Sequence, residues 1–173
     1  MRPINPVDEQ RSSIEKYLSL VNRQLSTIMS CILNIETSTS VCSVALSADG
    51  EVLFEKSSFE GPSHAALLGV YAEEAIAVTK EKGLKLDAVA VSSGPGSYTG
   101  LRIGVSVAKG LCFGYGIPLI SIPTLEVLAV AALEQQNNAS DCLYCAMLDA
   151  RRMEVYAAIY DVTVSYTHLR AHE

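Results

Sequence analysis

Short runs of apolar residues, or of alternating apolar and polar residues, predict three consecutive β-strands at 31–36, 41–47 and 51–57. Between the second and third strands, Ala48-Asp49-Gly50 is a hairpin-turn signal. The next segment, 63–82, repeats apolar residues at helical spacing. It predicts a helix that begins at the N-cap residue Ser63.

Strands and helices then alternate along the chain. The pattern predicts strands at 88–91 and 118–122, helices at 99–115 and 123–135, and two closing strands at 142–149 and 153–161. Three antiparallel strands followed by alternating helices and strands are typical of an α/β, ribonuclease H-like subdomain, a mixed sheet with flanking helices. The closing pair of strands predicts the start of a second, similar subdomain.

This order divides the chain into four parts. We expect residues 1–28 to be an extension, disordered or upstream of a natural start at Met29, and residues 29–136 to form the first subdomain. Residues 141–161 would be the first hairpin of a truncated second subdomain. The tail 162–173 has no periodicity and is not expected to supply a third strand.

Composition excludes several classes of protein. The 173-residue chain has a net charge of −6, so autonomous binding to nucleic acid is not expected and any RNA role would go through a partner. Arg102 and Lys109 interrupt the best apolar run, and the first 28 residues lack the apolar core of a signal peptide. We therefore expect a cytoplasmic protein with no membrane span.

The five cysteines have no disulfide-framework spacing. Cys142 and Cys145 form a C-x-x-C pair on a predicted strand, where residues three apart point to opposite faces. Shared metal or redox chemistry is therefore not expected, and the cysteines are predicted to be buried thiols.

The stretch 92–104 is rich in glycine. Gly94, Pro95 and Gly96 predict a tight turn before the helix 99–115. Gly96, Gly100, Gly104 and Ala108 recur every four residues and so share one helix face. A glycine turn before a helix N-terminus is a candidate anion site. The preferred alternative is that these glycines allow close helix packing.

The first hairpin offers a second candidate for binding phosphates. Proteins of this fold class that bind ATP present hydroxyl and amide groups there, and Glu36, Thr37 and Ser38 would provide them together with Gly94 and Gly96. Glu36 could imitate the aspartate with which such kinases hold a metal ion. A capped turn is the alternative, since phosphoryl transfer also needs a complete second subdomain.

Four motifs resemble the TsaB (YeaZ) family of bacterial tRNA-modification proteins. In chain order they are Ile35-Glu-Thr-Ser, Gly94-Pro-Gly-Ser-Tyr-Thr-Gly-Leu-Arg-Ile-Gly, Ala108-Lys-Gly-Leu and Asp149-Ala-Arg-Arg-Met-Glu-Val-Tyr. The resemblance implies an actin/Hsp70/sugar-kinase-like (ASKHA) fold. It also implies a non-catalytic partner of TsaD, which transfers a threonylcarbamoyl group to the adenosine 3′ of the anticodon, and of the ATPase TsaE.

TsaD-like sequences carry a metal-binding His-x-x-x-His on the helix after the fifth strand. The resemblance places Thr124 and Leu128 at those positions here, and neither can replace an imidazole, so no metal site and no catalytic residue are expected. Glu126 alone is not a site. No cofactor is expected either, except ATP or ADP at an interface of the complex. The alternative is an ATP-binding kinase-like or peptidase-like enzyme of the same superfamily.

The helix 63–82 is apolar over about half its circumference, wider than the roughly 100° stripe that packing on one sheet needs. This excess predicts a protein partner, either a TsaD-like subunit or a second copy of the chain. On the helix 99–115, a polar line opposite the glycine face is either solvated or the rim of that interface. The predicted interface is Leu67, Val70, Tyr71, Gly100, Arg102, Gly104, Ser106 and Lys109.

Overall fold

A computed structural model describes residues 30–59, 64–134, 142–163 and 166–171. The predictions for residues 1–28 and for the cap at Ser63 lie outside these ranges. Within the described residues, no helix is both long enough and apolar enough to span a membrane.

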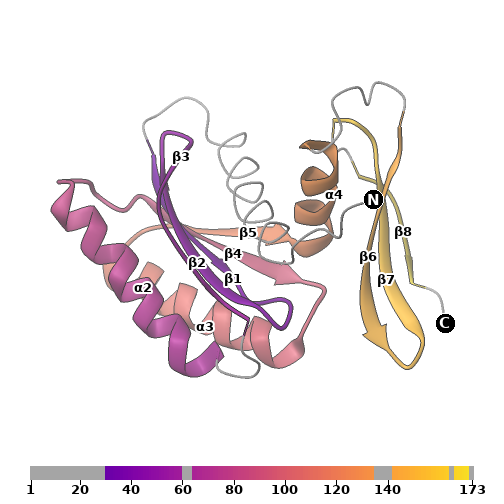
Figure 1. Cartoon of the computed structure of the whole chain (residues 1–173), viewed down its shortest axis with the longest axis horizontal. Helices are drawn as coiled ribbons and strands as arrows, with labels where there is room; N and C mark the ends of the chain where they lie inside the picture. Colours follow the sequence, from indigo (N-terminus) through magenta and orange to yellow (C-terminus); the bar gives the residue numbers. More distant parts are fainter. Residues whose placement is uncertain (1–29, 60–63, 135–141, 164–165, 172–173) are drawn as a thin grey trace.

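A five-stranded mixed sheet forms the centre of the molecule (Figure 1). Its strands lie in the order β3 (Glu51–Ser58), β2 (Cys42–Ala48), β1 (Cys31–Glu36), β4 (Ala88–Gly94) and β5 (Leu119–Pro123). The first three strands of the chain pair antiparallel, whereas β4 is parallel to β1 and β5 is parallel to β4. This topology confirms the ribonuclease H-like layout.

Helices cover both faces of this sheet. Helices α2 (His64–Glu81) and α3 (Tyr98–Tyr115) pack on one face, where alternate strand residues such as Leu33, Ile35 and Val89 meet Leu68 and Ala108. On the opposite face, Val127 and Val130 of α4 (Thr124–Glu134) contact Ile32, Ala90 and Ile122. The period of two along each buried strand thus separates the two cores.

A second sheet lies beyond α4 (Figure 1). Its strands β6 (Tyr144–Arg151), β7 (Glu154–Tyr160) and β8 (Tyr166–Ala171) are antiparallel in that order. Leu125 and Ala129 of α4 share a buried cluster with Tyr144, Ala146 and Ala158. Because α4 also packs on the first sheet, it joins the two sheets.

Strand β8 corrects the prediction for the tail. Residues 162–173 were expected to supply no third strand, yet 166–171 pair with β7. Periodicity reports which side chains are buried, whereas the ladder is made by backbone groups that every residue except proline carries. Strand β7 pairs with β6 along one edge, and its other edge can pair with a further strand. A segment without an alternating pattern can therefore still form the third strand.

The prediction of buried thiols is correct for Cys31 and Cys42 but wrong for Cys142 and Cys145, which are exposed. Strand β6 begins at Tyr144, so Cys142 precedes the sheet. Cys145 lies on the face of β6 that is turned away from the α4 cluster. Cys112 is half-buried.

We expect Cys142 and Cys145 to react with a disulfide reagent such as DTNB at pH 8 in the folded protein, while Cys31 and Cys42 react only on unfolding. Burial raises the pKa of the Cys42 thiol to about 11, so about a thousandth of it is thiolate at that pH. Mass spectrometry of the labelled peptides measures the order of reaction. Labelling of Cys42 as fast as Cys145 would contradict the fold.

Candidate functional site

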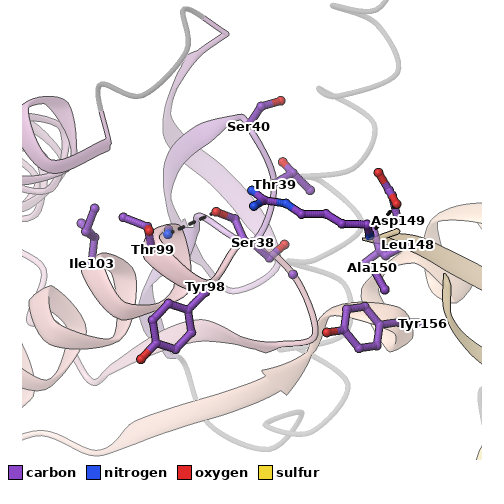
Figure 2. Close-up of a pocket in the computed structure, with 14 residues that line it drawn as sticks. Ser38, Thr39, Ser40, Tyr98, Thr99, Ile103, Leu148, Asp149, Ala150 and Tyr156 are labelled. Atoms are coloured by element: carbon purple, nitrogen blue, oxygen red, sulfur yellow. Dashed lines mark hydrogen bonds between the residues drawn. The ribbon is translucent and has the colours of Figure 1, made fainter. Parts of the chain in front are cut away.

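A cleft of about 920 Å³ opens at the start of α3, between the β1–β2 hairpin and the β6–β7 hairpin (Figure 2). The first wall is the hairpin segment Ser38, Thr39 and Ser40, with Gly96 to Gly100 beside it. The second wall comes from a distant part of the sequence, residues 148–151 and Tyr156. In Figure 2, Tyr98 and Tyr156 lie on opposite sides of this opening.

Helix α3 begins directly at the cleft. Ser97 is its N-cap, and its Oγ accepts from the Gly100 N–H at 3.4 Å while its carbonyl accepts from the Leu101 N–H at 2.8 Å. The Ser97 N–H donates to the Ser38 carbonyl at 2.6 Å and so ties the helix to the hairpin. Among the described residues, the N–H groups of Tyr98 and Thr99 have no hydrogen-bond partner.

The glycine face of α3 packs on that same hairpin. A Cβ at Gly96 would overlap the Ser38 carbonyl, and one at Gly100 or Gly104 would overlap the carbonyl or the Oγ1 of Thr37. The glycines therefore allow close packing. Their neighbour is the β1–β2 connection of the same chain at Thr37 and Ser38, and not a helix. Gly100 and Gly104 are buried, which corrects their assignment to the partner interface.

Glu36 is engaged inside the chain. Its Oε1 accepts from the Ser38 N–H at 2.7 Å and its Oε2 accepts from the Ser92 hydroxyl, which joins the first hairpin to the end of β4. Of the cofactor-binding residues expected from the sequence, Ser38 and Gly96 line the cleft. Glu36, Thr37 and Gly94 do not line it. The capped-turn alternative therefore describes Glu36.

The predicted apolar stripe of α2 is mostly turned inward. Tyr71 is 8% exposed and lies in the main core, and Leu67 packs against that core. Lys56 covers the Tyr71 ring, with its Nζ 4.9 Å from the ring centroid, and forms an ion pair with Glu74. Tyr71 is thus corrected from an interface residue to a core residue. Val70, 49% exposed, remains on the surface.

The predicted polar line of α3 is on the surface, since Arg102, Ser106 and Lys109 are all exposed. Sequence reasoning missed other members of this face. Phe113 is 92% exposed, and Gly69 of α2 and Gly110 of α3 have open space where a side chain would lie. We call the exposed surface of α2 and α3 the outer face. It comprises Gly69, Val70, Arg102, Ser106, Lys109, Gly110 and Phe113.

Sequence reasoning also missed the second wall of the cleft. Asp149, Arg151 and Tyr156 lie in a motif that the resemblance had singled out, but nothing in their spacing connects them with the distant hairpin at Ser38. Among the described residues, no three His, Cys, Asp or Glu side chains gather where they could hold a metal ion.

Comparison with known sequences gives a consistent set of relatives. Residues 60–168 match the family model described as TsaD, tRNA N6-adenosine threonylcarbamoyltransferase. The tRNA threonylcarbamoyladenosine biosynthesis protein TsaB of Escherichia coli is 37% identical over 131 residues, which cover 75% of this chain and 54% of the relative. TsaB of Haemophilus influenzae is 38% identical, covering 72% and 51%. The chain thus spans about half the length of these relatives.

A tRNA N6-adenosine threonylcarbamoyltransferase of Nitratidesulfovibrio vulgaris is also similar, 36% identical over 124 residues that cover 62% of this chain and 34% of the relative. Among solved structures, YeaZ from Pseudomonas aeruginosa aligns with a TM-score of 0.68 at 31% identity. The alignment covers 83% of this chain and 66% of that one.

Proposed function

The chain belongs to the TsaB (YeaZ) family, and from this membership we propose that it is a non-catalytic subunit in the biosynthesis of threonylcarbamoyladenosine in tRNA. It binds a TsaD-like catalytic subunit and activates it. The names of the similar proteins support a role in the biosynthesis of threonylcarbamoyladenosine. The exposed surface of α2 and α3 supports the binding of a TsaD-like subunit.

The outer face carries this proposal. Glycine in an exposed helix interior costs about 1 kcal/mol relative to alanine. Packing against Thr37 explains why Gly100 and Gly104 are glycines. No such contact explains Gly69 and Gly110, where an added side chain would meet open space. The outer face also leaves the large side chain of Phe113 in solvent. On α3, the missing side chain at Gly110 lies about one helical turn from the exposed ring of Phe113, and this combination suits the close approach of a second protein surface.

The positions that correspond to the TsaD histidines are packing positions here. Thr124 is buried, and Leu128 packs against the cluster that α4 forms with the second sheet. Burial raises the pKa of the neighbouring Glu126 carboxyl, which favours its neutral form. These residues support a structural role for α4. Both carboxylate oxygens of Glu36 accept hydrogen bonds within the chain, whereas the kinase-like alternative needs this carboxylate to hold a metal ion. The hydrogen bonds therefore favour the non-catalytic role.

The remaining partners follow from the same proposal. A TsaE-like ATPase joins through the TsaD-like subunit, and tRNA is bound by other subunits because this chain has a net charge of −6. The subunit works in the cytoplasm, where tRNA is modified. A second copy of the chain is the competing occupant of the outer face.

We expect the chain alone to transfer no threonylcarbamoyl group to tRNA, and a TsaD-like subunit supplied with TsaE-like ATPase to do so only when the chain is added. Incorporation of radiolabelled threonine into tRNA measures the transfer. Transfer by the chain alone would contradict the non-catalytic role. Equal transfer with and without the chain would contradict activation.

A further inference from the structure

One side of strand β2 is buried, and the described helices do not account for its burial. Ser43, Ala45 and Ser47 alternate along β2 with the residues that meet α2, so they point to the opposite face of the sheet. They are 3%, 1% and 0% exposed. Ala45 belongs to neither of the two hydrophobic cores of this sheet. The burial of these three residues therefore needs a further cover.

The described helices lie elsewhere on the sheet. Helices α2 and α3 pack on the other face. Helix α4 lies on the same face as Ala45, but its hydrophobic cluster takes residues of β1, β4 and β5 and none of β2 or β3. A cover over β2 must therefore come from another part of the chain or from a second molecule.

The N-terminal segment is the part of the chain best placed to supply this cover. Residues 1–29 directly precede β1, which is the neighbour of β2 in the sheet. A chain that turns back at the start of β1 can reach across to β2. The other stretches outside the described residues, 60–63, 135–141, 164–165 and 172–173, are too short to cover several strands.

The sequence of this segment has the pattern of a helix that packs on one sheet. Its apolar residues recur at the spacing of a single helix face, at Ile14, Tyr17, Leu18, Val21 and Leu25. The charged residues Glu15, Lys16 and Arg23 fall outside that stripe, which is about 100° wide. A helix over 13–28 would be about 24 Å long, and the 7-residue strand β2 is about 23 Å long.

We propose that residues 13–28 form an amphipathic helix that docks on the β2 side of the first sheet, with its apolar stripe over Ser43, Ala45 and Ser47. Small side chains on the strand leave room for the large side chains of the stripe, because facing layers interdigitate when large residues meet small ones. The segment is then part of the fold and not a disordered extension. Its docking does not depend on the proposed TsaD-like partner.

The experiment is thiol labelling of the full chain with the substitution Ala45→Cys, followed by mass spectrometry of the labelled peptides. We expect the thiol at position 45 to react at least about tenfold more slowly than the exposed Cys145. Leu18→Asp puts a charge into the apolar stripe and should raise the rate at position 45 at least about tenfold. Ser19→Asp adds the same charge outside the stripe and should leave the rate unchanged.

Cys42 provides the internal control, because it lies on the other face of the same strand in the core with α2. It should stay unreactive when Leu18→Asp releases the helix. If Cys42 also becomes reactive, the milder Leu18→Ala decides between the outcomes. A faster reaction at position 45 alone then supports the proposal, and equal changes at both positions overturn it.

Three further results would overturn the proposal. The first is a thiol at position 45 that reacts as fast as Cys145 in the chain with no other substitution. The second is a rate at position 45 that Leu18→Asp leaves unchanged. The third is protection that disappears on dilution, since the cover would then come from a second copy of the chain.

Discussion

Replacing Gly100 by alanine is expected to lower the free energy of unfolding by about 3 kcal/mol, because overpacking a rigid site costs about that much. The added Cβ would overlap the carbonyl oxygen of Thr37, a backbone atom that cannot rotate away. Either α3 or the β1–β2 hairpin must then move. For a chain of this size, each kcal/mol lowers the melting temperature by about 2–4 °C.

Gly110→Ala is the matched control, at an exposed position of the same helix. Its Cβ meets nothing within 4 Å, so the substitution should raise the free energy of unfolding by about 0.8 kcal/mol through helix propensity alone. Chemical denaturation followed by circular dichroism compares the two variants. Equal stability of Gly100→Ala and Gly110→Ala would mean that α3 does not pack on Thr37.

Gly110→Leu is expected to weaken binding of the TsaD-like subunit ten- to a hundredfold while leaving the isolated chain at least as stable as the unmodified one. The open space at Gly110 accepts the side chain, and leucine favours a helix over glycine. In the complex, the same side chain would fill the space into which the partner packs, at a cost of about 1–3 kcal/mol. Biolayer interferometry measures the affinity.

Met153→Ala provides the control for this interface. Met153 is a fully exposed apolar residue on the β6–β7 turn, outside the outer face. Its truncation should leave the affinity for the TsaD-like subunit unchanged. If Met153→Ala loses affinity and Gly110→Leu does not, the interface lies on the second sheet and not on the outer face.

The sequence predicts the order of elements well because burial imposes a period on each of them. Strand β1 has the predicted bounds, and the predicted helix 99–115 differs from α3 by one residue. The glycine spacing likewise identifies a shared face. It cannot identify the neighbour, because Thr37 lies far away in the sequence and reaches Gly100 only through the pairing of β1 with β4.

The outer face was harder to predict, since α2 and α3 carry apolar residues on several sides. When an apolar surface exceeds one stripe, periodicity cannot say which part faces the sheet. The pattern therefore predicts Tyr71 on the surface although it is in the core, and it gives no signal for Phe113, which is in solvent. The cleft forms where the β1–β2 and β6–β7 hairpins meet. Their positions are set by the packing of α4 on both sheets, which the sequence pattern does not reveal.

A titration of the chain with a TsaD-like subunit, followed by analytical ultracentrifugation, tests the central claim most directly. The account predicts a stable one-to-one complex that the unmodified chain and Met153→Ala form equally and that Gly110→Leu forms weakly. A chain that stays free at tens of micromolar subunit, or that pairs only with itself, would contradict it.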